Sequence, residues 1–133
     1  LDLNGFKPIN DNLGHAVGDE LLIGVGDRLR RCVRAGETVA RLGGDEFVVL
    51  IQATPETIGR AANRIVDAFD APFEVGDREM PIRPGAGLAV AGPGDLNGTG
   101  EELLKRADMA MYESKRSGDR LSCPSAPTSA KSS

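Results

Sequence analysis

Hydrophobic residues recur at helical spacing in three stretches of the chain. The first runs from Gly18 to about Arg34, the second starts at Thr54-Pro55 and ends near Pro72, and the third runs from Thr99 to about Ser117. Apolar residues three and four positions apart share one helix face, and threonine before proline or an acidic pair is a typical helix start. The sequence therefore predicts three amphipathic helices. Their apolar faces are Leu22, Val25, Leu29 and Cys32, then Ile58, Ala61, Ala62, Ile65, Ala68 and Phe69, then Leu103, Leu104, Ala107, Ala110 and Met111.

Between the first two helices the pattern changes to one typical of β-strands. Residues 38–42 and 46–51 are rich in β-branched and apolar side chains, and Gly43-Gly44 joins them. Because glycine readily adopts the positive φ of a tight turn, this segment is predicted to be a hairpin. Residues 73–91 alternate loosely and are interrupted by glycine and proline, which favours short strands. Residues 119–121 are expected to be a short last strand.

Interleaved helices and hairpins predict an α+β fold, in which helices pack on a mostly antiparallel sheet. Leu1-Asp2-Leu3 is typical of the end of a buried strand, so we expect the first helix and most of the first strand to lie upstream of the chain. Residues 1–121 are predicted to form one domain. Residues 122–133 contain Ser, Pro, Ala, Thr and Lys with almost nothing to bury, and are expected to be a disordered tail.

Charge and composition exclude several classes of partner. With 16 basic and 20 acidic residues the net charge is −4, which gives no broad attraction to nucleic acid or to anionic membranes. Cys32 and Cys123 do not form a disulfide framework, so a reducing cytoplasm is expected. No apolar run approaches the roughly 20 residues that cross a bilayer, so direct membrane insertion is not expected, although a longer parent protein could be membrane-tethered.

Acidic residues stand at two places that the predicted sheet would bring together. Asp2 follows the first apolar residue, and Asp45-Glu46 directly follows the hairpin turn. If the first strand lies beside the hairpin, these carboxylates converge at one edge of the sheet, where hard oxygen ligands hold Mg²⁺ and bridge it to phosphates. The alternative is that they are ordinary solvated carboxylates beside a turn, which is the more common case for such residues taken alone.

Several motifs occur in an order that resembles the GGDEF family of diguanylate cyclases. The resemblance covers about Leu1 to Arg120. Because the motifs coincide at matching spacing, it is highly specific. They are Leu1-Asp2-Leu3-Asn4-Gly5-Phe6-Lys7-Pro8-Ile9-Asn10-Asp11, Gly14-His15, Gly18-Asp19, Gly43-Gly44-Asp45-Glu46-Phe47, and Ala107-Asp108-Met109-Ala110-Met111-Tyr112 with Lys115.

The resemblance implies a palm-like sheet, ferredoxin-like and shared with nucleotidyl cyclases, and condensation of two GTP into cyclic di-GMP with release of pyrophosphate. It also implies a homodimer, a role in bacterial second-messenger signalling, and an upstream sensory domain in the parent protein. Two Mg²⁺ or Mn²⁺ ions per active site would lie among Asp2, the Leu3 carbonyl, Asp45 and Glu46. Asp45 and Glu46 are the candidate catalytic residues, and Glu46 would assist deprotonation of the attacking hydroxyl.

The same resemblance assigns the nucleotide contacts. Asn10 and Asp19 match the guanine-reading residues, and a carboxylate suits the paired N–H donors of guanine. Without the resemblance, Asn10 is interpreted as a turn residue and Asp19 as the cap of the first helix. The backbone around Gly5, Phe6 and Lys7 would bind the terminal phosphates. Lys115 and Arg120 would add positive charge.

Three positions depart from the family pattern. Asn4 stands where a second aspartate is frequent, and Arg120 follows Asp119, one residue later than the usual arginine. The product-binding motif Arg-x-x-Asp is replaced by a segment that begins at Arg34 and ends at Glu37, so we expect only weak product inhibition. Two other functions stay open: a catalytically silent relative that binds GTP or cyclic di-GMP as a sensor or partner-binding module, and a purely structural α+β module.

Overall fold

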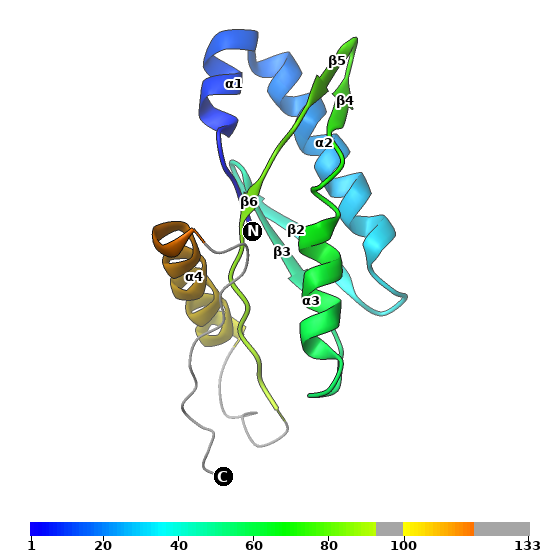
Figure 1. The fold of residues 1–133 in the computed structure, drawn as a ribbon, viewed down its shortest axis with the longest axis vertical. Coiled ribbons are helices and arrows are strands. Elements are labelled where there is room, and N and C mark those ends of the chain that lie inside the picture. The colour runs from blue at the N-terminus through cyan, green and yellow to red at the C-terminus, as the bar shows by residue number, and fades with distance from the viewer. Residues whose placement is uncertain (93–99, 119–133) are drawn as a thin grey trace. The chain divides into compact units, whose positions relative to one another are not determined.

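The computed structural model describes residues 1–92 and 100–118. The chain divides into two compact units, Leu1–Pro84 and Gly85–Ser133. In chain order the elements of Figure 1 are β1 (Asp2–Leu3), α1 (Phe6–Leu13), α2 (His15–Cys32), β2 (Thr38–Gly43), β3 (Glu46–Leu50), α3 (Ile58–Asp67), β4 (Phe73–Val75), β5 (Arg78–Met80), β6 (Pro84–Gly85) and α4 (Gly100–Ser117).

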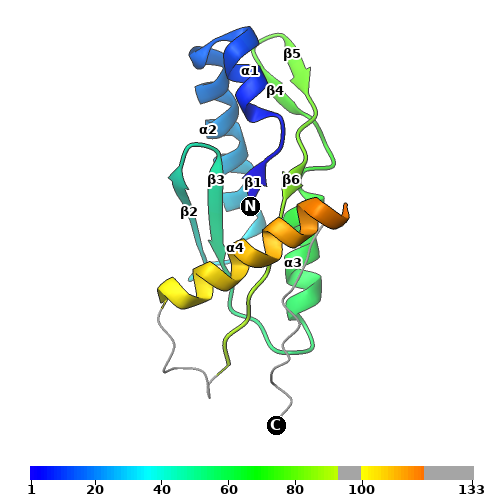
Figure 2. The ribbon, with the colours of Figure 1, turned by 90° about the vertical axis from the view of Figure 1, so that its left-hand side faces the viewer.

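Four strands form a sheet with the order β2-β3-β1-β6. Strand β3 runs antiparallel to both of its neighbours, β2 and β1. The N–H of Asn4 donates to the carbonyl of Arg83 at 3.0 Å, which ties the end of β1 to the start of β6. Strands β4 and β5 pair separately as an antiparallel hairpin. The predicted α+β class and the predicted hairpin across Gly43-Gly44 are both confirmed (Figure 2).

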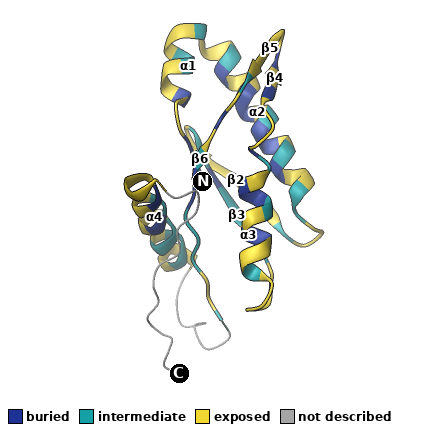
Figure 3. Cartoon of the chain, viewed as in Figure 1, coloured by how far each residue is buried: buried dark blue, intermediate teal, exposed yellow. Residues whose placement is uncertain are grey.

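The core of this unit is centred on α2. Leu21, Val25 and Leu29 are spaced four residues apart and are each 0% exposed, so one helix face is wholly covered. They belong to one hydrophobic cluster with Leu3 of β1 and Phe47 of β3. Burying a side chain of this size contributes roughly 1.5–3 kcal/mol. Figure 3 shows buried and exposed positions on opposite sides of α2 and α3, as the sequence pattern predicts.

The segment before α2 differs from the expectation. Phe6–Leu13 forms the helix α1, so the interpretation of Asn10 as a turn residue is wrong. Helix α2 begins at His15, three residues before the predicted start, and Asp19 therefore lies inside the helix and does not cap it. The physical reason is Gly14, whose φ of 95° breaks the chain between the two helices at a conformation that other residues rarely adopt.

Helix α3 also begins later than predicted. The N–H of Thr54 donates to Oγ1 of Thr57 at 3.0 Å, and the N–H of Thr57 donates to the Thr54 carbonyl at 3.0 Å. These bonds close a turn that contains Pro55, and the helix starts after it at Ile58. Its buried residues Ala61, Ala62 and Ile65 belong to the predicted apolar face, and Val66 adds to it. The helix ends at Asp67, before the predicted end near Pro72, so Ala68 and Phe69 follow the helix.

In the second unit, α4 matches the third predicted helix. The short strand expected at residues 119–121 and the tail expected at 122–133 lie outside the described residues. Neither α4 nor any other helix in the described ranges combines the length and the apolar character needed to cross a bilayer.

Candidate active site

The pairing of β1 with β3 places acidic residues directly across from each other. Asp2 is the register partner of Glu46, and the N–H of Leu3 donates to the Asp45 carbonyl at 3.2 Å. The neighbouring bond from the N–H of Phe47 to the Leu1 carbonyl, at 2.8 Å, fixes the same register from the other side. Register partners present their side chains on the same face of a sheet, with Cβ atoms about 4.5–5.5 Å apart. The structure therefore brings Asp2 and Glu46 together as predicted, whereas for Asp45 it places only the backbone beside β1.

The turn that delivers these residues depends on glycine. Gly43 and Gly44 have φ values of 133° and 52°, and the β2–β3 register shifts between Arg41 and Gly43. Nε of Arg41 donates to the Gly44 carbonyl at 3.0 Å and so braces the turn. Since a side chain at a positive φ is strained, this sequence can make so tight a return only with the glycine pair. Asp45 follows the turn immediately, which holds its backbone beside β1.

Carboxylates and backbone carbonyls are the hard oxygen donors that Mg²⁺ prefers. Like charges opposite each other on a sheet are destabilising unless a cation or another donor compensates them, so the Asp2 and Glu46 pair suits a cation. Across residues 1–92 and 100–118, no group of three His, Cys, Asp or Glu side chains is arranged to hold a metal ion. A cation at this site would therefore complete its shell with water and phosphate oxygens, which is the usual habit of Mg²⁺. The oxygen donors of Asp2 and Glu46 therefore fit a Mg²⁺ ion that keeps water and phosphate oxygens in the rest of its shell.

The start of α1 lies only three residues after Leu3. Gly5 is the N-cap residue, with φ 80° in the left-handed region and no side-chain capping bond. The helix supplies no acceptor for the N–H groups of its own first turn, which include those of Phe6 and Lys7, and such groups attract anions. Phe6 is 7% exposed and anchors this end of the helix, whereas Lys7 is exposed. The predicted phosphate contacts thus occupy a helix N-terminus.

Asn10 and Asp19 lie on two helices that pack together, α1 and α2. The Asn10 side chain lies against Gly18, and its Oδ1 is buried with no hydrogen-bond partner in the described part of the chain. A buried acceptor without a donor is unfavourable by about 1–3 kcal/mol. Asp19, next to Gly18, is exposed on α2. One predicted guanine-reading residue is therefore half-buried at the helix contact, and the other faces solvent.

Arg34 and Glu37 form a turn at the end of α2. The N–H of Glu37 donates to the Arg34 carbonyl at 3.0 Å, and Gly36, with φ 89°, occupies the position that needs a positive φ. The Glu37 carboxylate accepts from the N–H of Arg34 at 2.8 Å and from the N–H of Gln52 at 3.2 Å. The Arg34 bond, followed by the Gln52 bond, holds the pKa of the Glu37 carboxyl below its ordinary value. This carboxylate is engaged with the backbone.

Lys115 and Arg120 belong to the second unit. Lys115 is exposed in the last turn of α4, while Arg120 and Asp119 lie outside the described residues. A groove of about 350 Å³ lies between α1 and β5 in the first unit, and none of its lining residues is a predicted site residue. They are Ile9, Leu13, Arg78, Glu79, Met80 and Pro81.

Comparison with known proteins decides the family. The family described as "Diguanylate cyclase, GGDEF domain" matches residues 1–120. The chain belongs to the GGDEF family. It is 44% identical over 124 residues to the bifunctional diguanylate cyclase/cyclic di-GMP phosphodiesterase MucR of Pseudomonas aeruginosa, and the match covers 92% of this chain and 18% of MucR. The chain thus spans less than a fifth of the length of that relative, 18%.

Solved GGDEF domains share the fold. The crystal structure of the GGDEF domain of TpbB from Pseudomonas aeruginosa matches with a TM-score of 0.76 and 36% identity, covering 92% of this chain and 77% of that chain. A microbial GGDEF domain described in a novel interaction mode with cyclic di-GMP matches with a TM-score of 0.74 and 32% identity, covering 92% of this chain and 72% of that chain. The GGDEF family predicted from the motifs is therefore confirmed.

The sequence reasoning gave no packing role to three glycines. Gly18 leaves the space in which Asn10 lies, and Gly85 and Gly87 contact α4. Nothing in a local pattern distinguishes them from glycines that only break a helix or strand. The helix α1 had a usable signal, because Phe6, Ile9 and Leu13 recur at spacings of three and four residues.

Proposed function

We propose that this chain is the catalytic domain of a diguanylate cyclase, which condenses two GTP into cyclic di-GMP in bacterial second-messenger signalling. The observation that carries the proposal is the register of Asp2 opposite Glu46 at the β1–β3 pair, beside the glycine turn. Membership of the GGDEF family and the diguanylate cyclase activity named for MucR support it.

The reaction consists of two equivalent phosphoryl transfers. In each, the 3′-hydroxyl oxygen of one GTP bonds to the α-phosphorus of the other, the bond from that phosphorus to the β-phosphate oxygen breaks, and pyrophosphate leaves. The proton of the attacking hydroxyl passes to a base, for which Glu46 is the candidate. Because each subunit brings one GTP, the active form is a homodimer. An upstream sensory domain would bring the two subunits together, and a cytoplasmic setting supplies GTP.

Asp2, the Leu3 carbonyl, Asp45 and Glu46 would hold two Mg²⁺ or Mn²⁺ ions. When bound, these cations neutralise charge on the transferring phosphoryl group and lower the pKa of the attacking hydroxyl. The N–H groups from Gly5 to Lys7 at the start of α1 would bind the terminal phosphates.

Nucleotide selectivity would come from α1 and α2. Asp19 would accept from the paired N–H donors of guanine, an arrangement that adenine cannot match, and Asn10 would bind another part of the same edge. Lys115, together with Arg120, would supply positive charge to the triphosphate. The Oδ1 of Asn10 has no hydrogen-bond donor among the described residues, and an N–H of guanine would supply one.

The test is Glu46→Gln in a full-length protein that carries this domain. We expect a loss of cyclic di-GMP synthesis of about a hundredfold or more, because an amide cannot accept the proton and brings no charge to the cations. Product is measured by chromatography with Mg²⁺ and GTP. The matched control is Glu74→Gln, because Glu74 also stands opposite a glutamate, Glu79, in an antiparallel hairpin.

Near-normal turnover of the Glu46→Gln protein would remove Glu46 from the mechanism. An equal loss in the Glu74→Gln protein would mean that any cross-strand glutamate matters, and would also contradict the assignment. A protein that binds GTP or cyclic di-GMP but yields no product even without substitution would favour the silent relative instead.

A further inference from the structure

Within the second unit, residues 85–87 lie against α4 with almost no space between the two backbones. A β-carbon added to Gly87 would lie 2.1 Å from the Ala107 carbonyl oxygen and 2.3 Å from the Met111 nitrogen. Both of those are main-chain atoms of the helix, so no side-chain rotation could relieve the contact. Glycine at this position therefore lets α4 lie directly on the strand. Arg106 adds a bond from its Nη2 to the Val90 carbonyl at 3.3 Å.

Gly85 makes a different contact with the same helix. A β-carbon there would lie 2.6 Å from Cε, 3.0 Å from Cγ and 3.3 Å from Cδ of Lys115. The methylene stem of the lysine therefore lies across Gly85, in the space that any side chain at that position would fill. All three nearest atoms belong to this one side chain.

The two contacts follow one geometric rule. Gly85 and Gly87 are two residues apart on an extended segment, so they present the same face. Ala107, Met111 and Lys115 are four residues apart on α4, so they form one ridge along the helix. The ridge lies along the glycine face, and Lys115 is the member that ends at Gly85. The path of the lysine stem is thus set by the absence of a side chain at residue 85.

We infer that Gly85 is a positioning residue for the Lys115 ammonium group, and that it acts on nucleotide binding only through that lysine. The inference rests on the proposed function, in which Lys115 supplies positive charge to the triphosphate of GTP. A lysine stem in open solvent samples many rotamers, and confining it against Gly85 reduces the entropy lost when the ammonium meets a phosphate. Any β-carbon at residue 85 would push the stem aside and move the charge.

The experiment is a double-mutant cycle on GTP affinity in a full-length protein that carries the domain. The variants are Gly85→Ala, Lys115→Met, which removes the charge and keeps a long apolar chain, and the two combined. Affinity is measured by titration calorimetry in the presence of Mg²⁺, with GMP and with a GTP analogue in which the bridge between the α- and β-phosphates cannot be cleaved. Because the effect acts on the outer phosphates, the affinity for GMP is expected to change little in every variant.

We expect Lys115→Met to weaken binding of the GTP analogue about tenfold and Gly85→Ala to weaken it severalfold. The double variant should bind no more weakly than Lys115→Met alone, because Gly85 has no effect once the charge is gone. The melting temperature of Gly85→Ala should stay close to that of the unsubstituted protein, since the far end of a flexible side chain can move aside. Gly87→Ala, the neighbouring control, should lower it clearly.

The outcomes separate the two ideas. If Lys115→Met weakens binding but Gly85→Ala does not, or if the two effects multiply in the double variant, the inference about Gly85 is wrong and the proposed function stands. If Lys115→Met leaves the affinity for the GTP analogue unchanged, Lys115 does not contact the triphosphate. The role of Lys115 in binding and the positioning role of Gly85 are then both wrong. If the unsubstituted protein binds no GTP analogue, the proposed function itself fails.

Discussion

Gly18 of α2 and Asn10 of α1 fit together so closely that any side chain at residue 18 would displace the Asn10 amide. A β-carbon there would lie 1.9 Å from Oδ1 and 2.9 Å from Cγ of Asn10, and 3.3 Å from Cζ of Phe6. The Asn10 amide therefore fills the space that a side chain at residue 18 would take. Gly18 therefore controls where the Asn10 amide lies, and it directly precedes Asp19 in the chain. Asn10 and Asp19 are the two candidate guanine-reading residues.

We predict that Gly18→Ala moves the Asn10 amide and weakens GTP binding about fivefold to tenfold, the effect of losing roughly one hydrogen bond to the base. The preference for GTP over ATP should fall as well. Both are measured by competition of unlabelled nucleotides against labelled GTP. The matched control is Gly24→Ala in the same helix, where a β-carbon would meet only Phe73 Cδ1 at an ordinary 3.9 Å.

The control variant has its own expected result. Replacing glycine by alanine inside a helix stabilises it by up to about 1 kcal/mol, so Gly24→Ala should raise the urea midpoint and leave nucleotide binding unchanged. If Gly18→Ala bound GTP as well as the unsubstituted protein, Asn10 would not be a guanine contact. Equal losses in both variants would show a general effect of the substitution on α2.

The contrast between Glu46 and Gly18 shows what the sequence could predict. The convergence of Glu46 with Asp2 follows from strand periodicity and a glycine turn, because register in a hairpin propagates to the next strand. The role of Gly18 depends on how closely two helices approach, and no local pattern encodes that distance. The same is true of Gly85 against Lys115. Motifs therefore pointed to the candidate reacting groups, whereas the close contacts of Gly18 and Gly85 follow only from the folded structure.

Helix boundaries show a second limit. The apolar stripe of α2 was predictable, but its start at His15 depends on the backbone conformation of Gly14. The start of α3 likewise depends on the Thr54–Thr57 turn, in which the Thr57 hydroxyl accepts from the Thr54 N–H and does not cap the helix. Side-chain periodicity predicts which face of a helix is buried. It does not predict where the helix begins and ends, because individual residues and hydrogen bonds determine the ends.

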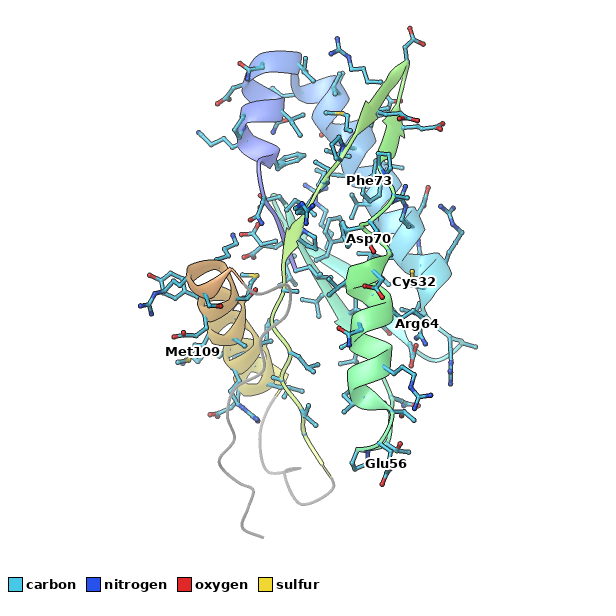
Figure 4. All side chains as sticks on the ribbon, in the orientation of Figure 1. Cys32, Glu56, Arg64, Asp70, Phe73 and Met109 are labelled. Atoms are coloured by element: carbon cyan, nitrogen blue, oxygen red, sulfur yellow. The ribbon has the colours of Figure 1, made fainter. Side chains whose placement is uncertain are left out.

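Arg28 is expected to be the most important charged residue for stability of the first unit. Its guanidinium donates from Nη1 to the Ala68 carbonyl at 2.9 Å and from Nη2 to the Pro72 carbonyl at 2.8 Å, and also donates to the Ala71 carbonyl. Its Cζ lies 3.6 Å from the centre of the Phe73 ring, the aromatic residue labelled in Figure 4. Burial lowers the pKa of this arginine below its ordinary value.

We predict that Arg28→Lys destabilises the chain by about 1–3 kcal/mol, because an ammonium cannot bond the carbonyls as a planar fork while stacking on the ring. The measurement is the urea midpoint of the 133-residue chain. Arg30→Lys is the control, since Arg30 pairs with Asp27 at 2.9 Å on the exposed side of the same helix. Surface pairs of this kind contribute at most about 1 kcal/mol. Similar losses in both variants would contradict the prediction.

Product inhibition is predicted to be weak, because the Glu37 carboxylate would have to leave two backbone N–H groups before it could bind a guanine. The shorter side chain of Glu37→Asp cannot span both partners, so we expect this variant to be inhibited up to about tenfold more tightly. Initial rates against added cyclic di-GMP provide the test. Glu56→Asp is the control, on the exposed turn before α3 (Figure 4). Tight inhibition of the unsubstituted protein, unaltered by Glu37→Asp, would refute this prediction.

The Glu37 carboxylate also gives the stability of the first unit a specific pH dependence. The Arg34 N–H lowers the pKa of this group in the folded chain below its ordinary value of 4.5. A group whose pKa is lowered on folding stabilises the chain above its unfolded pKa, and the stabilisation is lost as the pH falls through the folded pKa. The amide of Glu37→Gln still accepts one hydrogen bond but carries no charge.

We therefore predict that Glu37→Gln lowers the urea midpoint of the chain by a constant amount between about pH 7 and pH 5, and that the difference from the unsubstituted chain shrinks below about pH 4.5. Urea midpoints at several values down to about pH 3.5 give the measurement. Glu56→Gln corrects for the general effect of removing one negative charge. If the difference between the two urea midpoints stayed the same down to about pH 3.5, the negative charge of the Glu37 carboxylate would not be what stabilises the turn. The prediction would then be wrong.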